Sequence, residues 1–87
     1  MEVYTVLVEQ TSRFSGLNTY VDSIYLLEED SWNRIEEKYN SFTESIFMIP
    51  FGKIWFAEFR DKQFIVAYKN EYGIGYIKFI IHQGVVK

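Results

Sequence analysis

Only one stretch of the sequence has the periodicity of a helix, and this restricts the fold class more than any other feature. Trp32, Ile35, Tyr39 and Phe42 are spaced as a single apolar stripe with a repeat of 3.6 residues. Acidic residues occupy positions 28–30, at the start of the stripe, where the helix dipole favours negative charge. The pattern predicts a helix over residues 28–42 that ends near residues 40–41.

The remaining apolar segments are short and rich in β-branched and aromatic residues, which is typical of strands. These segments are 3–8, 20–27, 44–49, 53–59, 63–69 and 75–82. Pro50 follows the third of them and would end it, because proline cannot donate a hydrogen bond to a sheet. The order β-β-α-β-β-β-β predicts an α+β fold in a single domain, residues 1–87. One helix would pack on a mostly antiparallel sheet of about 5–6 strands.

The last three predicted strands carry apolar residues on both faces. One alternating set comprises Trp55, Ala57, Phe59, Ile65, Ala67, Ile77, Phe79 and Ile81; the other comprises Ile54, Phe56, Phe64, Val66, Tyr68, Tyr76 and Ile80. A half-solvated sheet alternates apolar with polar residues, and a helix of this length covers one face only. The second face therefore needs another chain, closure into a barrel, or a ligand. Self-association is the commonest solution and predicts a homodimer or small homo-oligomer.

Residue counts exclude several kinds of site. The chain of 87 residues has no cysteine, so it forms no disulfide and no cysteine-containing metal centre. His82 is the only histidine, and we interpret it as a structural or surface residue rather than a catalytic base. No serine, histidine and aspartate constellation is visible, so we predict neither a cofactor nor an enzyme. The absence of a signal sequence or long apolar segment predicts a cytoplasmic protein without membrane contact.

Charge is distributed unevenly along the chain. Residues 1–49 contain nine acids and three bases, whereas residues 50–87 contain three acids and six bases. The acids of the predicted helix could imitate spaced phosphates and occupy a site on a partner, or they could form a solvated helix face. On the first interpretation, the candidate partner-binding residues of this helix are Asp30, Asn33, Glu36 and Glu37.

Aromatic residues supply the other candidate contacts. Phe14 lies in the predicted loop 11–19, where it could enter a pocket on a partner or belong to a plain connection. Phe56, Tyr68 and Tyr76 lie in the basic C-terminal half, and exposed rings beside cations are typical of sheets that bind single-stranded nucleic acid. No RNP-like motif accompanies them, and rings in strands usually belong to a core.

Taken together, these features favour a non-enzymatic protein-interaction module. It would be a small inhibitor or regulator that binds and blocks, or scaffolds, another macromolecule. The many Phe, Tyr, Ile, Lys and Asn residues use A/T-rich codons, which suggests a phage or mobile-element origin. The first alternative is a protein that binds single-stranded nucleic acid through the basic aromatic sheet. The second is a small-molecule binder whose pocket lies at an oligomer interface.

Overall fold

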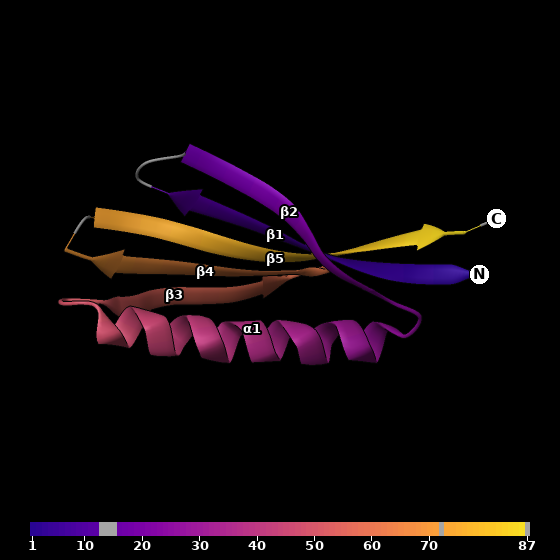
Figure 1. Ribbon diagram of the computed structural model, residues 1–87, viewed down its shortest axis with the longest axis horizontal. Helices are drawn as coiled ribbons and strands as arrows, with labels where there is room; N and C mark the ends of the chain where they lie inside the picture. The colour runs from indigo at the N-terminus through magenta and orange to yellow at the C-terminus, as the bar shows by residue number, and fades with distance from the viewer. Residues whose placement is uncertain (13–15, 72, 87) are drawn as a thin grey trace.

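One helix lies along one face of a five-stranded antiparallel sheet in the computed structural model, which describes residues 1–12, 16–71 and 73–86 (Figure 1). This confirms the predicted α+β class. The elements are β1 (Glu2–Ser12), β2 (Gly16–Tyr25), α1 (Glu28–Met48), β3 (Lys53–Arg60), β4 (Gln63–Asn70) and β5 (Gly73–Val85). No helix in the described part of the chain combines the length and apolar character that crossing a membrane requires.

The last strand of the chain lies in the middle of the sheet. The spatial order is β2-β1-β5-β4-β3, so β5 pairs with β1 on one side and with β4 on the other. Pairing of β1 with β5 extends from Glu2 opposite Val85 to Gln10 opposite Ile77. The Val86 amide also donates a hydrogen bond of 2.7 Å to the Met1 carbonyl oxygen. Both chain ends therefore lie together at one end of the long axis (Figure 1).

The predicted strand at residues 44–49 is wrong, because α1 continues through it to Met48. Ile46 extends the apolar stripe by one further turn and is buried. Thr43 and Ser45 donate hydrogen bonds to the carbonyl oxygens of Asn40 and Ser41, three and four residues back, which a helix allows. A short apolar run does not by itself distinguish a strand from a buried helical turn. The sheet consequently has five strands.

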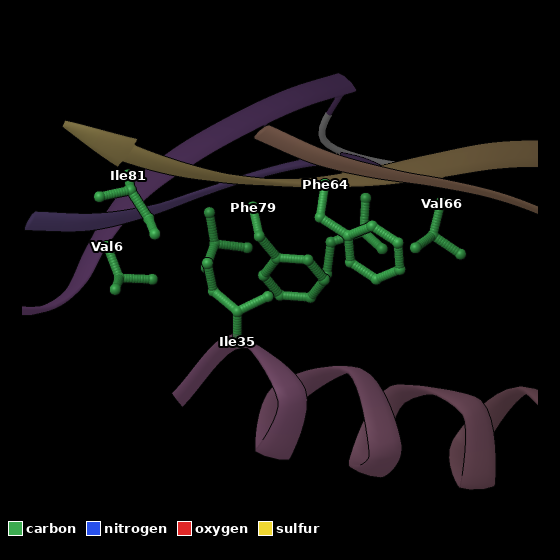
Figure 2. Packing of buried hydrophobic residues seen from close by; sticks show 8 residues of the cluster. Val6, Ile35, Phe64, Val66, Phe79 and Ile81 are labelled. Atoms are coloured by element: carbon green, nitrogen blue, oxygen red, sulfur yellow. The ribbon is translucent and has the colours of Figure 1, made fainter. Parts of the chain in front are cut away.

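Side chains from three adjacent strands and from α1 form the core. Val6, Phe64, Val66, Phe79 and Ile81 point from the sheet toward the helix, and Ile35 points up from the helix among them (Figure 2). The rings of Phe64 and Phe79 stack with centroids 6.3 Å apart. The core thus lies on a single face of the sheet, and the opposite face is left open.

Register in the sheet corrects the two alternating sets expected for the C-terminal strands. Phe64 pairs with Phe79 and Val66 with Ile77, so even positions of β4 share a face with odd positions of β5. The pairing of β3 shifts between Ile54 and Phe56, and this irregularity brings both Ile54 and Phe59 to the helix side. Phe56, Ile65, Ala67, Tyr76 and Ile80 lie on the open face.

An ion pair ties β2 to the side of α1 that lies away from β3. Register shifts near residue 22, and the Asp22 carboxylate meets the helix there. Arg34 donates to both of its oxygens, at 2.9 and 3.3 Å, and Lys38 lies 3.3 Å from one of them. The Arg34 hydrogen bonds lower the pKa of Asp22 to about 2, assisted by a hydrogen bond from Ser23 and opposed by burial.

Acidification is expected to remove the stability that Asp22 provides. Because its pKa is about 2 in the folded chain, against a usual 3.8, the unfolded chain is the first to bind a proton. The contribution is therefore complete above about pH 4 and is lost as the pH falls toward 2. It amounts to about 2 kcal/mol. Urea unfolding between pH 2 and 6 measures it.

Asp22→Asn should flatten this dependence between pH 2 and 4. Asp30→Asn is the matched control, because Asp30 is exposed and has no ion-pair partner within the described residues. An unchanged pH slope in Asp22→Asn would contradict the expectation.

Candidate functional site

A groove runs between α1 and β3, the strand at the edge of the sheet, with a cavity volume of about 510 Å³. We call it the α1–β3 groove. Its lining residues are Trp32, Ile35, Glu36, Tyr39 and Asn40 from α1, with Phe59 from β3 and Phe64 from β4. The α1 residues recur at intervals of three and four, so they share one side of the helix. One wall of the groove is therefore formed by residues at the edge of the apolar helix stripe.

Aromatic rings form the floor of the α1–β3 groove. Phe59 stacks on Phe64 with centroids 4.3 Å apart and an interplanar angle of 19°. Trp32 packs edge-on against Phe59 at 5.8 Å, and Tyr39 packs edge-on against Phe64 at 5.1 Å. Such edge-to-face and offset-stacked pairs are favourable, so the rings hold one another in place. A ligand would meet a largely preformed surface.

Phe59 is the residue of this floor that solvent reaches most. Its relative exposure is 66%, whereas Phe64, directly beneath it, is 7% exposed. Trp55 on the same strand and Phe47 on the helix are also exposed, at 57% and 65%. Aromatic side chains are enriched in interfaces and contribute large contact areas there. The groove is therefore chemically suited to bind an apolar or aromatic group.

The two long edges of α1 differ in charge. Arg34 and Lys38 lie on the edge toward β2, where they bind Asp22. Glu36 lies on the edge toward β3, and it forms no hydrogen bond or ion pair with any other described residue. Glu29 precedes Glu36 by seven residues, which places it two turns away on the same edge, and it too is unpaired within the described ranges. The rim of the groove is consequently acidic.

Lys62 does not neutralise this rim. Its ammonium lies 2.6 Å from Glu28 at the start of α1. The hydrogen bond from Lys62 lowers the pKa of the Glu28 carboxyl, and a hydrogen bond from Trp32 lowers it further. The positive charge of Lys62 is therefore balanced locally.

The candidate residues predicted on the helix are placed in three different ways. Glu36 lines the groove. Glu37 binds Arg34 at 3.1 Å on the exposed surface. Asp30 and Asn33 are exposed to solvent and do not line the groove.

The structure does not bring the predicted aromatic contacts together with these residues. Phe56 and Tyr76 lie on the open face of the sheet. Tyr68 lies on the helix side, half-buried, with its ring 5.2 Å from that of Phe42. Phe14 lies outside the described residues. The candidate set therefore divides between two opposite faces of the molecule.

The open face of the sheet is a second candidate surface. Val21, Leu7 and Ile80 are register neighbours and form an apolar row across three strands. Val21 is 58% exposed. The neighbouring row is polar and contains the ion pair of Glu9 with Lys78, 3.4 Å long. The sheet is thus apolar on both faces only in part, because charged rows alternate with apolar ones on this face.

Tyr76 completes the polar cluster on the open face. Its hydroxyl donates a hydrogen bond of 3.2 Å to the Glu9 carboxylate. Burial raises the pKa of Tyr76, and the hydrogen bond to Glu9 raises it further. Tyr76 is therefore neutral at physiological pH and acts in this cluster as a hydrogen-bond donor.

Residues with metal-binding chemistry do not converge anywhere in the described ranges. No group of three or more acidic, histidine or cysteine side chains is positioned there to hold a metal ion. His82 is exposed on β5, opposite Thr5 of β1.

Of the residues that line the groove, sequence reasoning singled out only Glu36 as a contact. Phe59 and Tyr39 are among those that it did not single out. Two signals point to them. Phe59 stands at the end of a strand beside the turn at Asp61, and Trp32, Glu36 and Tyr39 form an aromatic–acidic–aromatic row at intervals of four and three. Which strand lies beside that row depends on the strand order, which periodicity does not provide.

Comparison with protein-family models, curated proteins and solved structures finds no match to this chain.

Proposed function

We propose that this chain is a non-enzymatic protein-interaction module, a small inhibitor or regulator that holds a partner protein in the α1–β3 groove. The observation that carries the proposal is the solvent-open aromatic floor of that groove beside the carboxylate of Glu36, which has no partner among the described residues. Exposed, rigid aromatic surface rimmed by polar groups is typical of protein interfaces. A protein segment fits a solvent-open groove between a helix and an edge strand better than a metabolite that requires an enclosed pocket.

The ion pairs formed by the basic residues favour a protein partner over a nucleic acid. Single-strand binding requires cations that are free to pair with phosphates. In the C-terminal half, Arg60 lies 3.7 Å from Glu58, Lys62 binds Glu28, and Lys78 binds Glu9. Three of the cations expected to contact phosphates are thus already paired within the chain.

Site-specific photo-cross-linking tests the proposed function. A benzophenone amino acid replaces Phe59 in one variant and Ile74 in a control variant. Ile74 is equally exposed, at 69% against 66%, but lies on the open face of the sheet. Irradiation in cells that naturally make the chain should yield an adduct with a different protein from position 59, and from position 74 at most an adduct with a second copy of the chain. The adduct partner, purified, should bind the wild-type chain and lose binding to Phe59→Ser.

Two results would contradict this proposal. One is equal formation of adducts with other proteins from positions 59 and 74, which indicates non-specific contact. The other is a purified adduct partner that binds Phe59→Ser as tightly as wild type while circular dichroism shows that the variant is folded.

We further propose that two copies associate through their open sheet faces. Five strands about 4.8 Å apart, the shortest of them eight residues long, share a face of about 600 Å², which is near the lower limit for a stable interface. The apolar row through Val21 supplies the contact. The adjacent Glu9–Lys78 pair offers both signs of charge, so a twofold axis can set each carboxylate against the other copy's ammonium.

Light scattering during size-exclusion chromatography measures this association. We expect a mass near twice the chain mass of 10.4 kDa for wild type and a monomer for Val21→Lys, because a lysine in the apolar row would be desolvated. Val85→Lys is the control, since Val85 is comparably exposed, at 67%. A monomeric wild type at high micromolar concentration would refute the dimer and leave the groove proposal standing.

A further inference from the structure

We infer that the α1–β3 groove recognises an arginine side chain on the partner segment, with the guanidinium stacked on the aromatic floor and paired with Glu36. This inference rests on the proposed function and specifies the chemistry of the partner. Three observations support it: the arrangement of the rings, the position of the unpaired carboxylate, and the separation of charges along α1.

The rings of the groove present the kind of surface on which a guanidinium stacks. Phe59 exposes one side to solvent while its other side is stacked on Phe64. Trp32 stands edge-on to Phe59, so the two rings form a corner. A planar cation placed in such a corner is attracted by ring faces, and arginine uses this contact more often than lysine. A purely aliphatic ligand would gain burial but not this attraction.

Glu36 provides the matching negative charge. It belongs to the wall of the same groove, and no described residue compensates its carboxylate. The cations nearest to it along the helix, Arg34 and Lys38, are held on the opposite edge by Asp22, and Arg34 also pairs with Glu37. Their charge is therefore already balanced, and Glu29 adds negative charge to the groove edge. Charge complementarity consequently selects a cationic ligand over a neutral or acidic one.

The apolar residues of the groove define what flanks the arginine. Ile35 and Tyr39 line the wall below the rim. An extended segment with leucine on either side of the arginine can bury its apolar side chains against Tyr39 and the exposed Phe59 ring while the guanidinium reaches Glu36. The expected ligand is thus a short protein segment with an arginine between apolar residues.

The experiment titrates the whole protein with acetyl-Leu-Arg-Leu-amide and with the same peptide carrying citrulline. Citrulline keeps the shape of arginine and removes its charge. Binding is followed by the Trp32 indole resonance in proton–nitrogen NMR spectra, assigned with Trp55→Phe. We expect the arginine peptide to shift this resonance and to bind about 5-fold or more tightly than the citrulline peptide.

Glu36→Gln removes the charge and keeps the shape of the groove. It should weaken binding of the arginine peptide by about 5-fold and abolish its advantage over citrulline. Glu44→Gln is the matched control, because Glu44 is an exposed acid of the same helix that does not line the groove. It should leave both affinities unchanged.

Equal affinity for the two peptides, or an Arg-peptide affinity unchanged by Glu36→Gln, would overturn the arginine inference. Absence of any Trp32 shift at millimolar peptide would also overturn it. None of these three results decides the proposed function, because cross-linking from position 59 detects a groove-bound protein whatever its side-chain chemistry. Loss of that adduct, in turn, would refute the proposed function independently of the peptides.

Discussion

Replacing Phe79 by alanine is expected to destabilise the protein by about 3–5 kcal/mol. Phe79 is fully buried at the centre of the core, on the strand that lies in the middle of the sheet. Its ring stacks against Phe64 and faces α1 (Figure 2). The substitution removes a large apolar side chain and leaves a cavity that strands paired on both sides cannot close. Small domains are stable by about 5–15 kcal/mol, so the loss is a large fraction of the total.

Urea unfolding followed by circular dichroism measures the change. Phe47→Ala is the control, because Phe47 is 65% exposed and its loss should change stability by about 0.5 kcal/mol or less. If Phe79→Ala does not fold, Phe79→Leu provides a smaller cavity and should fold with an intermediate loss. A cost below about 1 kcal/mol for Phe79→Ala would mean that the core does not centre on this ring.

Replacing Gly52 by alanine is expected to lower the free energy of unfolding by about 3 kcal/mol, because the added Cβ atom overlaps the backbone. Gly52 lies directly after α1, where its amide donates a hydrogen bond of 2.9 Å to the Ile49 carbonyl oxygen. A Cβ atom there would overlap the carbonyl oxygen of Ile46. Because that oxygen belongs to the last helical turn, no side-chain rotation can relieve the overlap. The turn between α1 and β3 would have to move.

Gly84→Ala is the matched control for this effect. A Cβ at Gly84 meets only the His82 imidazole, at 4.0 Å, which is ordinary contact. Alanine in a strand is also favoured over glycine, so stability should be unchanged or raised by about 0.5 kcal/mol. Equal urea midpoints for Gly52→Ala and wild type would show that the helix end adapts without strain.

The two proposed surfaces are compatible, because they lie on opposite faces of the sheet. The α1–β3 groove is on the helix side, whereas the row through Val21 is on the open face. A dimer formed through the open faces would therefore leave both grooves accessible. Two arginine-bearing segments could then bind at once, and a partner with two such segments would gain from effective concentration.

The edge strands of the sheet are a further place where a partner could bind. β2 and β3 each pair with a single neighbour in the described sheet, so each has one unpaired edge. The unpaired edge of β3 lies beside the α1–β3 groove. The register shift between Ile54 and Phe56 interrupts that edge. Irregularities of this kind disfavour the addition of a further strand. Partner binding through side chains in the groove is thus better supported than strand addition at β3.

Local pattern was sufficient to predict most of the elements. The Trp32 stripe with acids at its start predicts α1, because helix periodicity and dipole matching are properties of neighbouring residues. Five of the six predicted strands are present in the structure. They could be predicted because alternation and turn residues act over short distances along the chain. Glu36 was predicted as a contact residue from its place on an acidic helix. These inferences needed no knowledge of where the strands lie.

The sequence alone determined the element types other than the end of α1, together with the absence of disulfides and the uneven charge; tertiary structure decided everything that depends on distant neighbours. Residues 44–48 are helical, and Ile46 gains burial there, which local propensity does not measure. Irregular pairing near Asp22 and Trp55 changed which residues share a face. Strand order placed β3 beside α1, and so brought Phe59 to Trp32 and Glu36. A groove requires residues from two elements to converge, and that convergence is fixed by packing, not by spacing along the chain.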